Sequence, residues 1–199
     1  MCCVVLLQVL EFAANIVREI AVDNNLNIGL DGVRLAVTAY STQIKQIVTF
    51  QQNFNASMTI NAILTDKHLK AFTHMKEAIE NASRALEQAA RERSGAKQVM
   101  ILFSDGKPAY SNSSSMVSRH YQRNLIQQVI DTLEGVMDSG VKVYMIGVNR
   151  AEDMILEAVE RHDNGYANRS SDFSGLDAFT ANIINKLEIN CPSPPMDSE

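Results

Sequence analysis

The chain has 199 residues, of which 46% are hydrophobic and 21% are charged. This composition is typical of a soluble globular protein, and the length suits one domain with a substantial core. The net charge of -5 excludes a basic field of the kind that attracts nucleic acid or anionic lipid. No stretch approaches the ~20 apolar residues that a membrane-spanning helix needs, so we expect no membrane span.

The N-terminal sequence CCVVLLQVLEFAANIV begins with a short apolar run and continues with a helical period. It has no basic n-region, and Gln8 and Glu11 interrupt its apolar character, so no signal peptide is recognisable in this chain. We predict a short strand over residues 4–7. The helix after it is predicted to begin late, nearer Leu10 than Val9.

Two strands are predicted over 33–42 and 44–50, close enough in sequence to form an antiparallel hairpin. Residues 51–66 show no clear period and are interpreted as a polar connection. A long helix follows, with one apolar face. That face consists of Leu69, Phe72, Met75, Ile79, Ala82, Leu86 and Ala89.

The second half of the chain alternates strands and helices. This pattern predicts a doubly wound α/β fold, in which a mostly parallel sheet has one antiparallel edge strand and helices cover both faces. We interpret residues 1–190 as a single domain and 191–199 as a Pro-rich tail. The expected strands are 99–103, 141–148 and a weak one near Tyr166. A short helix is expected at 154–159. Two longer helices are expected from their apolar faces, the first with Leu125, Val129, Ile130, Leu133 and Val136, and the last with Leu176, Phe179, Ile183 and Leu187.

The strand over 99–103 ends abruptly in Ser104-Asp105-Gly106. Open α/β sheets bind ligands at the carboxyl ends of their strands, which is where Asp105 stands. An Asp-Gly pair after a strand is also common turn chemistry. The junction by itself is therefore compatible with a binding site and with an ordinary turn.

The order of several sequence blocks resembles the von Willebrand factor type A domain family, which includes integrin I domains and collagen-associated adhesion modules. The resemblance extends over nearly the whole chain. Its most specific part consists of the fourth-strand block KQVMILFSDG and the fifth-strand block GVKVYMIGVNRAEDMILEAV, in this order. The blocks are VRLAVTAYST, IKQIVTF, THMKEAIENASRAL, KQVMILFSDG, GVKVYMIGVNRAEDMILEAV and SDFSGLDAFTANIINKLEINC.

The resemblance implies a divalent-cation site at the top of the sheet, the metal-ion-dependent adhesion site, where a partner's carboxylate completes the coordination shell. Thr73 and Asp105 match two of the three ligand loops of this site. The third loop, Asp-x-Ser-x-Ser after the first strand, is missing, because the chain passes from Leu7 to Val9 with only the neutral Gln8 between them. Mg²⁺ dehydrates reluctantly, so we expect no bound cofactor, and Mg²⁺ or Mn²⁺ only if other oxygens rescue the site.

The family resemblance implies a non-enzymatic protein-binding or adhesion module of extracellular-matrix or cell-surface type. Its partner would be a protein such as collagen or another matrix or cell-surface protein, and the parent protein would be secreted. One alternative is an intracellular scaffold domain of the same fold. Another is a doubly wound enzyme that uses Asp105, although the sequence has no Gly-rich phosphate loop, Asp-x-Asp-x-Thr motif or Ser/His/Asp arrangement to accompany it.

The implied fold also gives the cysteines a role. It places Cys2 or Cys3 at the amino end of the first strand, and the last helix returns to that end just before Cys191, so a disulfide between them is expected in an oxidising compartment.

Asn81 lies two residues past Ile79 and is predicted on the solvent face of its helix. Four Asn-x-Ser sequons permit N-glycosylation: Asn55, Asn81, Asn112 and Asn168.

Overall fold

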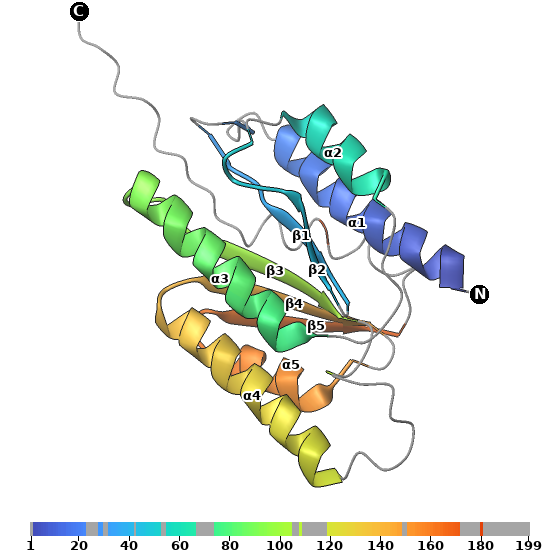
Figure 1. Ribbon diagram of the computed structural model, residues 1–199, viewed down its shortest axis with the longest axis vertical. Helices are drawn as coiled ribbons and strands as arrows, with labels where there is room; N and C mark the ends of the chain where they lie inside the picture. The colour runs from blue at the N-terminus through green and yellow to red at the C-terminus, as the bar shows by residue number, and fades with distance from the viewer. Residues whose placement is uncertain are drawn as a thin grey trace, which may run out of the picture.

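The structure is a computed structural model. The structure describes residues 2–22, 28–29, 32–41, 43–52, 55–66, 74–104, 108, 119–148, 151–171 and 180, with the side chains of all of these except 2–9 and 119. The described part is an α/β arrangement in which strands are flanked by helices (Figure 1).

The second half of the chain forms a parallel three-stranded sheet. Its strands are β3 (Val99–Ser104), β4 (Lys142–Val148) and β5 (Gly165–Ser170), in the spatial order β3-β4-β5. Helix α4 (Arg119–Asp138) connects β3 to β4, and α5 (Asp153–Arg161) connects β4 to β5. The predicted alternation of strands and helices is therefore confirmed in this half, with element boundaries within a few residues of those expected.

Helices cover both faces of this sheet. Helix α3 (Met75–Glu92), α4 and α5 pack on one face, where Val143 and Met145 of β4 are buried. Helix α1 (Cys2–Val22) packs on the other face, against Tyr144 and Ile146 of the same strand. Because successive side chains of β4 enter opposite cores, the strand is buried continuously from Val143 to Val148 and does not alternate between apolar and polar residues.

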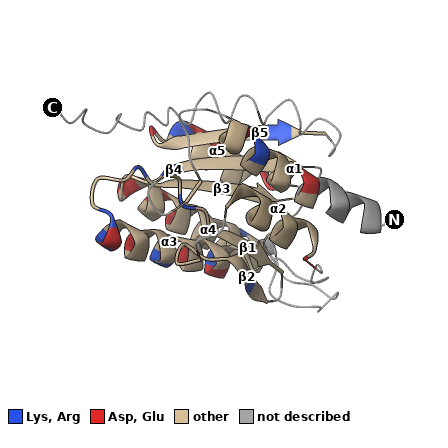
Figure 2. Ribbon diagram, turned by 90° about the horizontal axis from the view of Figure 1, so that it is seen from above, with Lys and Arg blue, Asp and Glu red and all other residues tan. Residues whose placement is uncertain are grey.

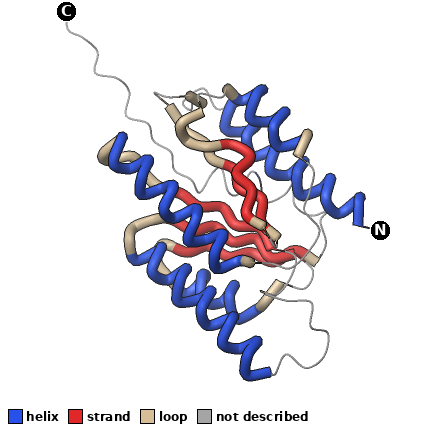
Figure 3. Tube along the Cα trace, viewed as in Figure 1, coloured by secondary structure: helices blue, strands red, loops and turns tan. Residues whose placement is uncertain are grey.

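The predicted hairpin is confirmed, and it forms a separate two-stranded sheet (Figure 3). Strands β1 (Val37–Tyr40) and β2 (Ile44–Val48) pair antiparallel, with Tyr40 opposite Ile44. Among the described strands, β1 pairs only with β2, and β3 pairs only with β4. The two sheets are connected through side chains, since the hydroxyl of Tyr40 donates a hydrogen bond to the carbonyl oxygen of Phe103.

A second side-chain connection lies near the opposite ends of these strands. The guanidinium of Arg93 donates to the carbonyl oxygen of Gly32, and Arg34 forms an ion pair of 3.0 Å with Glu92. Residues 32–34 precede β1, and residues 92–93 precede β3. Since Tyr40 meets Phe103 at the carboxyl ends, β1 and β3 run in the same direction.

The prediction of a strand over 4–7 and a late helix start is wrong, because helix α1 already begins at Cys2. A strand followed by a helix needs a connecting turn, typically about two to six residues long. Only Gln8 separates Leu7 from Val9, and glutamine and leucine are good helix formers. The chain therefore continues the helix through this segment instead of turning.

Residues 51–66 were interpreted as a connection, but they contain helix α2 (Ala56–Leu64), which packs beside α1. Asn55 caps this helix, and Ile63 packs on Ala14 and Val17 of α1. The many Asn, Ser and Thr residues suggested a loop, whereas one of them is the helix cap and Thr59 is buried in the helix interior.

Helix α3 begins at Met75, and the predicted residues before it, 69–73, lie outside the described residues. The same holds for the Pro-rich tail and for the last predicted helix, of which only Thr180 is described.

Candidate functional site at the carboxyl end of the parallel sheet

Thr73 and Asp105 lie outside the described residues, but their described neighbours contact the same short segment. The amide of His74 donates to the carbonyl oxygen of Ser41 at 3.0 Å. Tyr40, the residue before Ser41, donates to the carbonyl oxygen of Phe103, two residues before Asp105. The carboxyl end of β1 therefore connects the two chain positions that flank the predicted metal ligands.

The position of the third ligand loop is occupied by a helix. Gln8 lies inside α1, which runs without interruption from Cys2 to Val22. The ring of Phe12 in this helix packs edge-on against the ring of Phe103, with 4.9 Å between ring centroids. Helix α1 thus passes the carboxyl end of β3 as a continuous element, and residues 2–22 contain no loop that could present oxygen ligands there.

Polar groups at this end of the sheet have structural partners. Ser104 ends β3 and is buried, as is Ser41 after β1. Arg169 of β5 donates to the carbonyl oxygen of Ala151 at 3.0 Å and also pairs with Asp153. It therefore stabilises the segment that connects β4 to α5. In the described ranges, no three His, Cys, Asp or Glu side chains gather closely enough to hold a metal ion.

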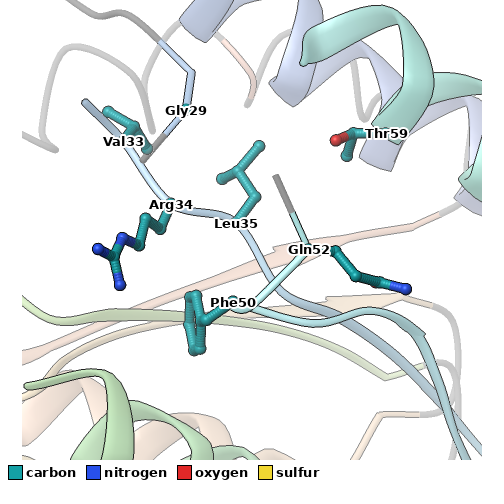
Figure 4. A pocket seen from close by; sticks show the side chains of 7 residues that line it. All are labelled: Gly29, Val33, Arg34, Leu35, Phe50, Gln52 and Thr59. Atoms are coloured by element: carbon teal, nitrogen blue, oxygen red, sulfur yellow. The ribbon is translucent and has the colours of Figure 1, made fainter. Parts of the chain in front are cut away.

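A small pocket lies between the segment before β1, the segment after β2 and helix α2 (Figure 4). Its volume is about 10 Å³, which is room for roughly one water molecule. The hydroxyl of Thr59 lines it, is buried, and has no hydrogen-bond partner among the described residues. The pocket fits a bound water that satisfies this hydroxyl, and it is too small for a substrate.

A groove of about 390 Å³ separates α3 from α4. Its walls carry Glu80, Arg84 and Glu87 from α3, and its floor includes Gly135 of α4. The groove carries both signs of charge, since Arg84 lies between Glu80 and Glu87 on α3, and acidic and basic residues both occur along the described helices (Figure 2). These surfaces therefore offer no focused electrostatic field for a highly charged ligand.

The predicted disulfide assumed that Cys2 or Cys3 begins the first strand, but the structure has a helix at these residues instead. Cys2 and Cys3 begin helix α1, and this end of the helix lies beyond the carboxyl ends of the parallel strands (Figure 1). The placement of these cysteines at the amino end of the sheet is therefore wrong, because the segment is a helix and not the first strand. Cys191 lies outside the described residues.

The sequon asparagines have different environments. Asn55 is exposed and caps α2, whereas Asn168 of β5 is half-buried. Asn81 is also half-buried, and its Oδ1 is inaccessible to solvent, so the prediction of a solvent-facing position is wrong. The angular estimate failed because helix α3 is covered over more of its circumference than the one apolar face. Asn112 lies outside the described residues.

Comparison with protein-family models identifies a von Willebrand factor type A domain over residues 4–182. The chain therefore belongs to this family, as the sequence blocks predicted. No curated protein sequence matches the chain. Among the helices that the structure describes, none is both long enough and apolar enough to cross a membrane.

Solved structures of the same fold include proximal thread matrix protein 1 from the mussel byssus, with a TM-score of 0.65 and 17% identity over 90% of this chain. The same mussel protein, with a zinc-occupied metal-ion-dependent adhesion site, aligns with a TM-score of 0.67 and 15% identity over 88% of this chain. The pilus adhesin SpaC from Lactobacillus rhamnosus GG aligns with a TM-score of 0.65 and 16% identity over 90%.

These alignments confirm the α/β fold. The chain spans 40% and 42% of the two mussel protein chains and 27% of the adhesin chain, so the similarity concerns one part of each of these longer proteins. The zinc-bound mussel structure also establishes that a metal can occupy the adhesion site in this family.

Proposed function

We propose that this chain is a non-enzymatic protein-binding module of extracellular-matrix or cell-surface type, and that it binds its partner without a cation. The observation that carries the proposal is the continuous helix α1 in a member of the von Willebrand factor type A family. In this family the missing segment would supply the Asp-x-Ser-x-Ser loop. Similar structures belong to a thread matrix protein and a pilus adhesin, which supports an adhesive role.

The residues that remain do not fit a tightly bound Mg²⁺ or Mn²⁺. Of the matched positions, Asp105 offers one carboxylate and Thr73 one hydroxyl, while Gln8 is neutral and lies within a helix. Magnesium needs about six oxygen ligands in near-octahedral geometry and gives up its waters reluctantly. Two protein oxygens are too few to offset that cost, so no step of partner binding is assigned to a metal.

Without the cation, partner recognition depends on ordinary surface contacts. Interspersed charges on the described helices favour a partner that is itself a protein with both signs of charge, such as collagen or another matrix protein. Binding of this kind is insensitive to chelators, whereas cation-bridged adhesion is abolished by them.

Isothermal titration calorimetry with Mg²⁺ and Mn²⁺ tests the metal part of the proposal. We expect no saturable heat from the unaltered chain and no difference from Asp105→Ala or Thr73→Ala. Saturable binding that disappears in Asp105→Ala would contradict the proposal, because other oxygens would then have replaced the missing loop.

A gain-of-function variant makes the same test sharper. Inserting a flexible loop with the Asp-x-Ser-x-Ser pattern between Leu7 and Gln8 should restore the third ligand group and bring Mg²⁺ binding. An insertion of equal length with Ala at the Asp and Ser positions is the matched control. If the first insertion folds and still binds no metal, Thr73 and Asp105 are not positioned as the family resemblance implies.

The adhesive part is tested by binding to immobilised collagens and other matrix proteins in the presence of Mg²⁺ or EDTA. We expect saturable binding that is unchanged by EDTA. Binding that EDTA removes would contradict a cation-independent mode, and absence of binding to every matrix protein would contradict the matrix assignment.

A further inference from the structure

We infer that Asn55 is an N-glycosylation site, and that the fold rejects a glycan at Asn81 and Asn168. The inference rests on the extracellular setting of the proposed function, because glycan transfer takes place in the secretory lumen. It is carried by the geometry of three described asparagines that share the same Asn-x-Ser sequence.

The two ends of the Asn55 side chain have separate roles. Its Oδ1 accepts a hydrogen bond of 2.9 Å from the amide of Met58 and thereby caps helix α2. Its Nδ2 donates to no residue that the structure describes, and the side chain is exposed. A sugar on Nδ2 leaves the carbonyl oxygen in place, so glycosylation and helix capping are compatible at this residue.

At Asn168, by contrast, the Nδ2 that would carry a sugar is itself hydrogen-bonded. It lies within strand β5, is half-buried, and its Nδ2 donates to the hydroxyl of Tyr166 at 3.4 Å. Tyr166 packs in turn against Tyr144 of β4, with 5.8 Å between ring centroids. A glycan on Nδ2 would have to displace this contact on the face of the sheet that α1 covers.

Asn81 is also unsuitable. It lies in the middle of α3, is half-buried, and its Oδ1 is inaccessible to solvent. A sugar on Nδ2 would be attached next to this buried oxygen, on a half-buried side chain in the middle of a helix, whereas the Asn55 side chain is exposed at a helix end. Its sequon serine, Ser83, lines the groove between α3 and α4.

The surroundings of Asn55 accommodate a sugar. Ser57, the third residue of the sequon, is exposed, and so is Met58, whose exposed fraction is 49%. Met58 lies three residues after Asn55, within the first turn of α2, so the first sugar can cover part of this apolar side chain. A glycan here also shields the outer surface of α2, which leaves the remainder of the domain for partner binding.

The modification itself is a redox-neutral group transfer from a lipid-linked oligosaccharide. Nδ2 of Asn55 forms a bond to C1 of the first sugar and loses one proton. The bond between C1 and the oxygen of the lipid pyrophosphate breaks, and the pyrophosphate leaves with the bonding electron pair.

The test uses the full chain, expressed behind a cleavable secretory leader in a eukaryotic host, with Asn112→Gln in every variant. Secreted and retained protein are both treated with a peptide-N-glycosidase and analysed by intact mass and peptide mapping. We expect a glycan at Asn55 and none at Asn81 or Asn168 in folded protein. Unmodified Asn55, or folded protein with a glycan at either other site, would overturn the inference.

Ser57→Ala is the matched control, since it removes the sequon and retains the Asn55 cap. The Ser57→Ala protein should show no glycosidase-sensitive mass shift at Asn55. After glycosidase treatment of both proteins, its melting temperature should equal that of the protein with Ser57. Binding to matrix proteins is measured separately. If the chain is glycosylated at Asn55 but binds no matrix protein, only the proposed adhesive function is contradicted. If the chain binds a matrix protein but Asn55 is unmodified, only the inferred glycosylation site is contradicted.

Discussion

The parallel sheet and the N-terminal half of this domain differ in how completely they are buried. Six of the seven residues of β4 are buried, whereas all four residues of β1 are half-exposed. The sheet is enclosed by helices on both faces, and the hairpin is connected to it by side chains. The parallel sheet therefore has the packing of a complete domain core, whereas strand β1 is partly exposed and is joined to that sheet by side chains and not by strand pairing.

This difference has a local cause. The segment before Leu10, which was expected to be a strand, continues helix α1 instead, and no described strand lies between β1 and β3. A strand that paired with both β1 and β3 would have joined the two sheets by backbone hydrogen bonds. With residues 4–7 in a helix, the two sheets are connected through side chains, while the strands of the parallel sheet pair in continuous register.

The largest expected effect is at Gly165, where α5 meets β5. A Cβ on this residue would overlap the carbonyl oxygen of Val159, which is backbone and cannot move aside. We expect Gly165→Ala to lower the free energy of unfolding by more than about 4 kcal/mol, enough to unfold a marginally stable domain. Urea denaturation followed by circular dichroism measures this.

Gly135→Ala is the control for that experiment. Gly135 lies in α4, and a Cβ there meets no atom within 4 Å. Alanine in a helix is favoured over glycine by about 0.5–1 kcal/mol, so this variant should be slightly stabilised. Similar effects of the two substitutions would contradict the close approach at Gly165.

Phe12→Ala tests the attachment of α1 to the sheet. Phe12 is 1% exposed and contacts Phe103, so its truncation should cost about 3–4 kcal/mol. Hydrogen exchange should show the loss of protection concentrated in α1 and β1, with β3 and β4 less affected. An equal loss of protection in both regions would mean that the domain unfolds as one cooperative unit.

Tyr40→Phe removes the hydroxyl that joins the two sheets and leaves the carbonyl of Phe103 without that donor. We expect a loss of about 1–2 kcal/mol in unfolding free energy. The variant keeps the aromatic ring and its packing on the core around α3. An unchanged stability would show that this hydrogen bond does not couple the sheets.

The smallest effect is expected at the cap of α2. Asn55→Ala removes the acceptor for the Met58 amide and should cost about 1 kcal/mol. Asn55→Asp keeps an acceptor oxygen and should remain within a few tenths of a kcal/mol of the unaltered chain. Thermal unfolding of unglycosylated protein distinguishes the two, and equal losses would contradict the capping role.

Much of the second half could be predicted from the sequence. The apolar positions of α4, from Leu125 to Val136, recur at helical spacing, and the structure buries them. Strands β3 and β4 are apolar runs between such helices, which is typical of a parallel sheet covered on both faces. Of the candidate site, the sequence shows no Asp-x-Ser-x-Ser pattern between Leu7 and Val9, and in the structure this segment is helical.

The sequence by itself determined the family and the order of the parallel strands and helices along the chain, because these depend on local periodicity and on recognisable sequence blocks. Only the tertiary structure decided that residues 4–7 are helical, that Asn55 begins a helix, and that the sheet is divided. The reason is physical: an apolar run such as VVLL satisfies a strand or a helix equally well, and its conformation depends on the packing of distant residues such as Phe12 and Phe103.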